Sequence, residues 1–189
     1  MPTQAEVARY LQGALLLAKG DASGIRLFDL SIEGFWRSFS AALIAAPAYL
    51  VVLIDRFNLV GWPENLLGSL TVETIAYGCG WVAFPIAAIF LTRVLGLSGR
   101  YVPLIVAGNW SAVLQIGLYT AVLLGSLVLP QDLRAVLVLA VTIAVLVYQW
   151  FVIRSALETS SGIAFGLLVV DALLSMTVSR AVGALLQPA

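Results

Sequence analysis

The segment Ser161–Leu186 decides the fold, and it reads SGIAFGLLVVDALLSMTVSRAVGALL. A helix rises about 1.5 Å per residue, so a helix over this segment is long enough to cross the roughly 30 Å hydrocarbon core of a bilayer. An acid, Asp171, stands about ten residues from the start of the segment and hence roughly 15 Å deep. The segment therefore predicts a membrane span with a carboxyl group near its centre.

The composition places the whole chain in lipid. Hydrophobic residues make up 61% of the 189 residues and charged residues 11%, whereas soluble domains carry about 25% charged residues. The mean hydropathy is +1.03. Ten basic and ten acidic residues balance, so no basic field exists for a nucleic acid, which we exclude as a partner. With one cysteine and no histidine, we expect no disulfide, no metal site and no cofactor.

Five apolar segments are about 20 residues long or longer, the length that a membrane-spanning helix needs. In lipid each backbone polar group must be satisfied within its segment, which favours helices, and the alternation of a strand barrel is absent. We predict an all-α fold, an integral membrane bundle of five transmembrane helices over residues 35–189. The spans are expected at residues 38–55, 66–92, 101–129, 133–153 and 161–186.

Residues 1–34 are predicted to form a separate segment outside the spans. Apolar residues such as Val7 and Leu11 recur there at helical spacing, while Glu6 and Arg9 fall on another face, which indicates an amphipathic helix over residues 3–18. Two placements fit this pattern. The helix could lie at the membrane interface beneath the headgroups, or it could pack on the ends of the bundle.

Aromatic residues beside arginines mark the expected membrane interfaces, where aromatic rings sit at headgroup level and arginine reaches water. Phe35, Trp36 and Arg37 precede the first span, and Trp150 and Arg154 close the fourth. We predict that these five residues are interfacial anchors.

The distribution of Lys and Arg predicts the orientation of the chain. In a five-span arrangement seven of these residues fall on the amino-terminal side and three on the other. The positive-inside rule then predicts a cytoplasmic amino terminus and a periplasmic carboxyl terminus, in the cytoplasmic (inner) membrane of a bacterium. The seven are Arg9, Lys19, Arg26, Arg37, Arg93, Arg100 and Arg154, and the three are Arg56, Arg134 and Arg180.

Asp171 is the first candidate site residue, because a carboxylate at mid-depth costs several kcal/mol unless it is paired, hydrated or protonated. It could be a proton or ion site, or a hydrogen-bonded acid that fixes helix packing. Tyr77 in the second span and Asn109 in the third lie at nearly the same depth. We predict that at least one of them contacts Asp171 in an intramembrane polar cluster.

Glu73 and Arg180 form the second candidate site. Glu73 lies about seven residues inside the start of its span, and Arg180 lies about six residues inside the end of the last span. Both are therefore at a similar depth below the membrane face where the carboxyl terminus is expected. Opposite charges at one depth in lipid usually pair, so an ion pair between them is predicted. The alternative is that Arg180 extends outward while Glu73 faces a water-filled vestibule.

Small residues predict close helix approach, notably Gly78-Cys79-Gly80 in the second span. An alternative is that these glycines unwind the helix to form a substrate site. No serine stands beside a base and no phosphate-binding loop occurs, so we expect no catalytic residues and no enzyme.

The layout of an amphipathic amino-terminal segment followed by five closely spaced spans resembles the Yip1-domain membrane proteins. The entry to the third span, Arg100-Tyr101-Val102-Pro103, is similar to the polar, proline-containing entry of that domain. The resemblance covers residues 35–186 and implies a membrane-organising or trafficking adaptor, with no catalytic residues to carry over. The lead-in Phe28–Phe39 is also similar to uncharacterised bacterial inner-membrane proteins.

Two functions are therefore expected from the sequence. The first is a non-enzymatic membrane scaffold or accessory subunit, whose partners are membrane lipids and either another protein or a second copy of the chain. The second is a small-solute or proton-coupled carrier in which Asp171 is the ion-binding acid. Replacement of Asp171 by asparagine separates them, because a carrier would lose activity while staying folded.

Overall fold

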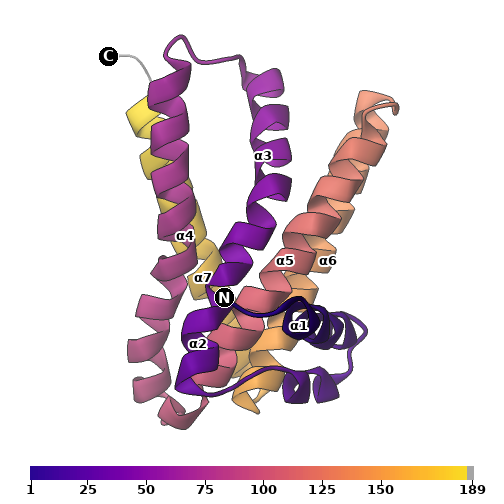
Figure 1. The fold of residues 1–189 in the computed structure, drawn as a ribbon. Helices are drawn as coiled ribbons and strands as arrows, with labels where there is room; N and C mark the ends of the chain where they lie inside the picture. Colours follow the sequence, from indigo (N-terminus) through magenta and orange to yellow (C-terminus); the bar gives the residue numbers. More distant parts are fainter. Residues whose placement is uncertain (187–189) are drawn as a thin grey trace.

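The computed structural model describes residues 1–186, and over this range all regular structure is helical (Figure 1). The chain runs through α1 (Gln4–Ala18), the 3-10 helix η1 (Ala22–Leu27), α2 (Ile32–Ser38), α3 (Ser40–Val60), α4 (Leu66–Val94), the 3-10 helix η2 (Ser98–Arg100), α5 (Tyr101–Ser126), α6 (Gln131–Leu157) and α7 (Ser161–Leu186).

Five helical stretches within the described range are long and apolar enough to cross a membrane: Ile32–Val60, Leu66–Val94, Ser98–Ser126, Gln131–Leu157 and Ser161–Ala184. The predicted all-α multi-pass fold is confirmed at this level. The first stretch combines α2 and α3 and begins earlier than the sequence predicted, because the Ser31 hydroxyl accepts a hydrogen bond from the Gly34 amide at 3.0 Å and caps α2.

The bundle has two ends that differ in packing. We name the amino-terminal face after the end that carries α1 and residues 95–100 between α4 and α5, and the opposite face after the end with residues 61–65 and 127–130. In Figure 1 the lower end is the amino-terminal face, where the helices lie close together, while α3, α4 and α5 stand apart at the upper end. The largest fully buried side chains include Trp110, Leu104, Ile153 and Leu157, all in the halves of α5 and α6 that lie toward the amino-terminal face.

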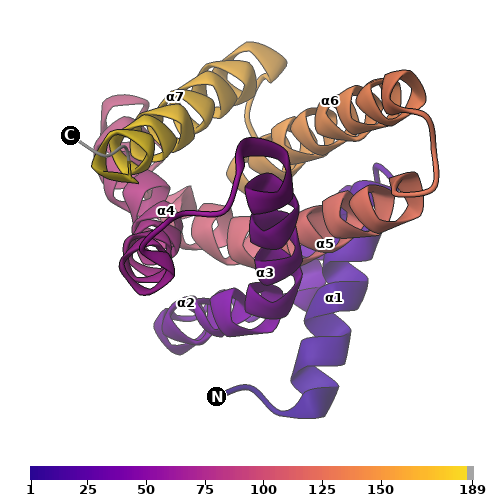
Figure 2. The same cartoon turned by 90° about the horizontal axis from the view of Figure 1, so that it is seen from above.

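Helix α1 packs across α5 and against α6 rather than standing free (Figure 2). The Tyr10 ring lies 4.8 Å from the Trp110 ring, centroid to centroid, and the Tyr148 hydroxyl donates to the Ala14 carbonyl at 2.7 Å. The helix therefore packs on the bundle, as one of the two predicted placements required. Contact with a headgroup layer stays a prediction.

The start of α1 is fixed by hydrogen bonds between Thr3 and Glu6. The Thr3 amide donates to the Glu6 carboxylate at 2.6 Å, and the Thr3 side chain accepts from the Glu6 amide in the reciprocal arrangement of a capping box. These bonds, from the Thr3 amide first and then its hydroxyl, hold the pKa of Glu6 below its usual value. Arg37 of α2 also pairs with Glu6 at 3.3 Å, so α1 is tied to α2.

The glycines of α4 neither unwind the helix nor allow close approach of a neighbouring helix. Helix α4 is continuous over Leu66–Val94, so the helix is not unwound at Gly78-Cys79-Gly80. A Cβ atom added at Gly78 or Gly80 would meet nothing within 4 Å, and Cys79 is exposed. Close approach needs glycine instead between α1 and η1, where a Cβ on Gly24 would lie 2.3 Å from the Gly13 carbonyl oxygen.

Candidate functional site

A cavity of about 640 Å³ lies between the five spans. Every one of α3 to α7 contributes to its wall. Its polar lining residues are Tyr49 and Arg56 from α3, Glu73 and Tyr77 from α4, Asn109 and Gln115 from α5, Gln149 from α6, and Asp171, Ser175 and Ser179 from α7. The remaining lining residues are apolar.

The cavity extends from buried residues in the amino-terminal half of the bundle, such as Leu104 and Ile153, past mid-depth toward the opposite face. Asp171 is ten residues from the start of α7 at Ser161, which puts it roughly 15 Å along the helix. Arg56, four residues from the end of α3 at Val60, lines the far end, and its side chain is 45% exposed. Ile105 and Val152, which belong to the buried core, form its wall on the amino-terminal side.

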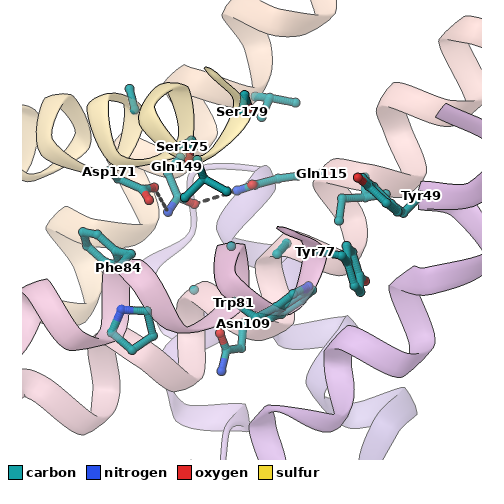
Figure 3. Close-up of a pocket in the computed structure, with 18 of the residues that line it drawn as sticks. Tyr49, Tyr77, Trp81, Phe84, Asn109, Gln115, Gln149, Asp171, Ser175 and Ser179 are labelled. Atoms are coloured by element: carbon teal, nitrogen blue, oxygen red, sulfur yellow. Dashed lines mark hydrogen bonds between the residues drawn. The ribbon is translucent and has the colours of Figure 1, made fainter. Parts of the chain in front are cut away.

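Asp171 forms the end of a short chain of hydrogen bonds (Figure 3). Gln149 Nε2 donates to Asp171 Oδ2 at 3.3 Å, and Gln115 Nε2 donates to Gln149 Oε1 at 2.8 Å. Because the Gln149 oxygen accepts from Gln115, its amide nitrogen is directed at the carboxylate. The polar partner of the intramembrane acid is therefore a glutamine of the preceding span.

The predicted contact of Asp171 with Tyr77 or Asn109 is wrong. The Tyr77 hydroxyl donates to the Ala42 carbonyl at 2.7 Å, and Asn109 Nδ2 donates to Ser38 Oγ at 2.9 Å. All three predicted residues do line the same cavity. The three residues lie at a similar depth, as predicted. The rotation of each helix, however, directs Tyr77 toward α3 and Asn109 toward α2.

The second predicted pair is also wrong, because Glu73 pairs with Arg56 and not with Arg180. The Glu73 side chain is 2% exposed; it forms an ion pair with Arg56 and accepts a hydrogen bond from the Tyr49 hydroxyl at 3.1 Å. Arg180 is exposed and enters no ion pair among the described residues. The cation therefore comes from α3, the helix directly before α4 in the chain and antiparallel to it.

A further ion pair joins α3 to α6 beside this end of the cavity. Arg134 near the start of α6 pairs with Asp55, the neighbour of Arg56, and both side chains are mostly buried. The sequence treats Asp55 and Arg56 as the charged end of a span. In the structure Asp55 pairs with Arg134 and Arg56 pairs with Glu73, and α3 continues beyond both residues to Val60.

The predicted interfacial anchors lie at the amino-terminal face. On α2, the Phe35 ring lies 5.7 Å from the Tyr101 ring, Trp36 is 69% exposed, and Arg37 pairs with the acids of α1 and α2. At the end of α6, Arg154 lies 5.7 Å above the Trp150 ring. Their contact with lipid headgroups stays a prediction.

The residues that sequence reasoning missed are Gln149, Arg56 and Tyr49. The predicted spans end at residues 153 and 55, so Gln149 lies only four residues from a predicted end and Arg56 lies just beyond one. The helices end at Leu157 and Val60. Counted from these ends, Gln149 lies eight residues deep, close to the ten of Asp171, so depth would have found this partner.

The described residues contain no group of three or more metal-ligating side chains. Fold and site together define a multi-pass helical protein with an acidic side chain, Asp171, on the wall of a cavity between its spans. No family model, curated protein or solved structure matches the chain. The resemblance to the Yip1-domain layout therefore stays an expectation from the sequence.

Proposed function

We propose that this chain is a non-enzymatic small-solute carrier that binds its solute in the central cavity, with Asp171 as the binding acid. The observation that carries the proposal is the position of this carboxyl group, at mid-depth on the wall of a cavity of about 640 Å³. Ligand sites for small molecules usually have volumes of about 300–1,000 Å³ and mostly apolar walls with a few placed polar groups.

The partners of Asp171 favour a binding site over a packing role. A carboxylate has two oxygens and roughly four acceptor positions, and Asp171 receives one hydrogen bond, from Gln149. An acid retained only for helix packing would have its oxygens satisfied by neighbouring helices, because an unmet polar group in lipid costs free energy. The unused acceptor positions of Asp171 lie at the cavity wall, where a solute can use them.

A membrane scaffold or accessory subunit is the second candidate. Ile32 and Trp36 of α2 favour it, because they are 76% and 69% exposed beside α1 and offer an apolar patch to another helix or a second copy of the chain. This role does not require a solute in the cavity.

We further propose that the amino-terminal face is cytoplasmic, in the inner membrane of a bacterium. Arg93 and Arg100 support this orientation, since both flank the α4–α5 connection at the face that carries α1. Loops rich in Lys and Arg stay in the cytoplasm.

Cysteine accessibility tests the carrier proposal. In a Cys79→Ser background, Ser175→Cys places a thiol on the cavity wall, whereas Thr177→Cys places one on the same helix outside the cavity. A carrier must expose its site to both sides in turn. We expect a membrane-impermeant thiol reagent to label Ser175→Cys from either side of sealed vesicles, and about tenfold or more faster than Thr177→Cys, which lies in lipid.

The two candidates predict different patterns of labelling. Access to Ser175→Cys from one side only would contradict alternating access and would leave the scaffold as the better proposal. Equal rates at Ser175→Cys and Thr177→Cys would show that no water-filled cavity exists, and the carrier proposal would fail.

A further inference from the structure

The charges on the cavity wall do not balance, and this imbalance identifies a class of solute. Among the described lining residues the charged groups are Arg56, Glu73 and Asp171. Arg56 and Glu73 pair with each other. Asp171 has no cation beside it in this set, so its carboxylate is the one charge that the wall leaves uncompensated. A charge in a low-dielectric site needs an opposite charge close by.

Resting on the solute-binding function proposed above, we propose that the cavity binds an organic monocation with an apolar body, whose charged group sits at Asp171. The hydrogen-bond chain prepares this site. Gln115 directs the amide of Gln149 toward the carboxylate, and the N–H of that amide donates to one carboxylate oxygen. The carboxylate then attracts a cation while one of its oxygens is held in place.

The size of the cavity selects an organic cation over a bare ion. A dehydrated sodium ion or proton occupies a small fraction of about 640 Å³. Metal cations also require several oxygen ligands around one point, and no group of three or more acidic, histidine or cysteine side chains occurs among the described residues. The volume that remains beyond Asp171 fits the body of a molecule.

The aromatic residues of α4 suit such a body. Tyr77, Trp81 and Phe84 line the cavity, and Figure 3 shows Phe84 on the part of the wall below Asp171. Aromatic faces attract organic ammonium groups and also bury apolar surface. The wall thus combines one anionic end with an aromatic and aliphatic surface.

The test uses two isosteric probes, phenyltrimethylammonium and tert-butylbenzene, which differ only in one central atom: a positively charged nitrogen in the first and a neutral carbon in the second. Protection of Ser175→Cys from the neutral reagent N-ethylmaleimide is measured in the full-length Cys79→Ser protein in lipid nanodiscs. The cation is expected to protect the thiol at concentrations at which the neutral probe does not. Asp171→Asn should raise the half-protecting concentration of the cation by about 100-fold, because loss of one partner of a desolvated charge pair is costly.

Matched variants separate charge from packing. Asp171→Glu keeps the charge and should keep cation protection within about tenfold of the parent, whereas Gln149→Leu should weaken it less than Asp171→Asn does, because the carboxylate remains. Thermal stability of each variant in nanodiscs is measured alongside, and only variants that retain the parent's transition are compared.

Each outcome decides between the two proposals. Equal protection by both probes, or protection by the cation that survives in Asp171→Asn, would overturn the cation assignment and leave a solute cavity in place. Labelling of Ser175→Cys at the rate of Thr177→Cys, with no protection by either probe, would overturn the solute-binding function itself.

Discussion

The ion pair between Glu73 and Arg56 predicts an asymmetric response to mutation. The Glu73 side chain is 2% exposed and the Arg56 side chain 45%. Arg56→Gln leaves a buried carboxylate with the Tyr49 hydroxyl as its hydrogen-bond donor. Loss of one partner of a buried pair costs about 3–5 kcal/mol, and we expect about 3 kcal/mol here, because Arg56 is partly solvated and the pair is correspondingly weaker.

Glu73→Gln should cost less, about 1 kcal/mol, the value of a typical hydrogen bond. Its amide oxygen can still accept from Tyr49, and Arg56 can turn toward water because it is half-exposed. In the double variant, Arg56→Gln with Glu73→Gln, no charge is left buried. The double variant should therefore be more stable than Arg56→Gln alone by about 2 kcal/mol, a favourable coupling of the kind that double-mutant cycles measure.

Thermal unfolding in detergent micelles measures these differences, followed as loss of monomer on size-exclusion chromatography. For a chain of this size, about 2 kcal/mol corresponds to roughly 4–8 °C in Tm. Arg180→Gln is the control, since exposed Arg180 enters none of the ion pairs found over residues 1–186. If Arg180→Gln destabilised the protein as much as Arg56→Gln, or if the double variant gained nothing, the pairing described here would be refuted.

Three further predictions concern α1 and α2. Gly34→Ala should destabilise α2 by more than about 1 kcal/mol, because its Cβ would lie 2.1 Å from the Asp29 carbonyl oxygen, while Gly117→Ala, with open space around it, should leave Tm unchanged or higher. Tyr148→Phe removes the hydrogen bond to the α1 backbone and should speed proteolysis after α1 at Lys19; an unchanged cleavage rate would contradict this anchor. The lowered pKa of Glu6 means that its carboxylate stabilises α1 above the unfolded pKa of about 4.5. As the pH falls from this value through the lower pKa of the folded state, amide exchange in α1 should become faster. Glu6→Gln should abolish this pH dependence of amide exchange.

The candidate site could be predicted in part, and its residues show where the prediction failed. Asp171 and Glu73 stood out because an acid inside an apolar run is rare and costly in lipid. Their partners were missed because the predicted helices ended too early. The predicted first span ends at Asp55 because charges usually mark span ends, yet Asp55 and Arg56 each pair with a residue of another helix, and α3 continues to Val60. An error of four or five residues displaces a side chain by roughly 6–8 Å.

The sequence by itself determined the class of the protein: helical, multi-pass and built of five spans, with two acids inside them. Hydrophobic length is a local property, and lipid allows a single open chain to satisfy its backbone only as helices. The tertiary structure alone decided which side chains meet. Depth fixes one coordinate of a residue, but the rotation of each helix fixes the direction of its side chain, and rotation is set by packing against neighbours. That packing joined Asp171 to Gln149 and placed both on the wall of one cavity.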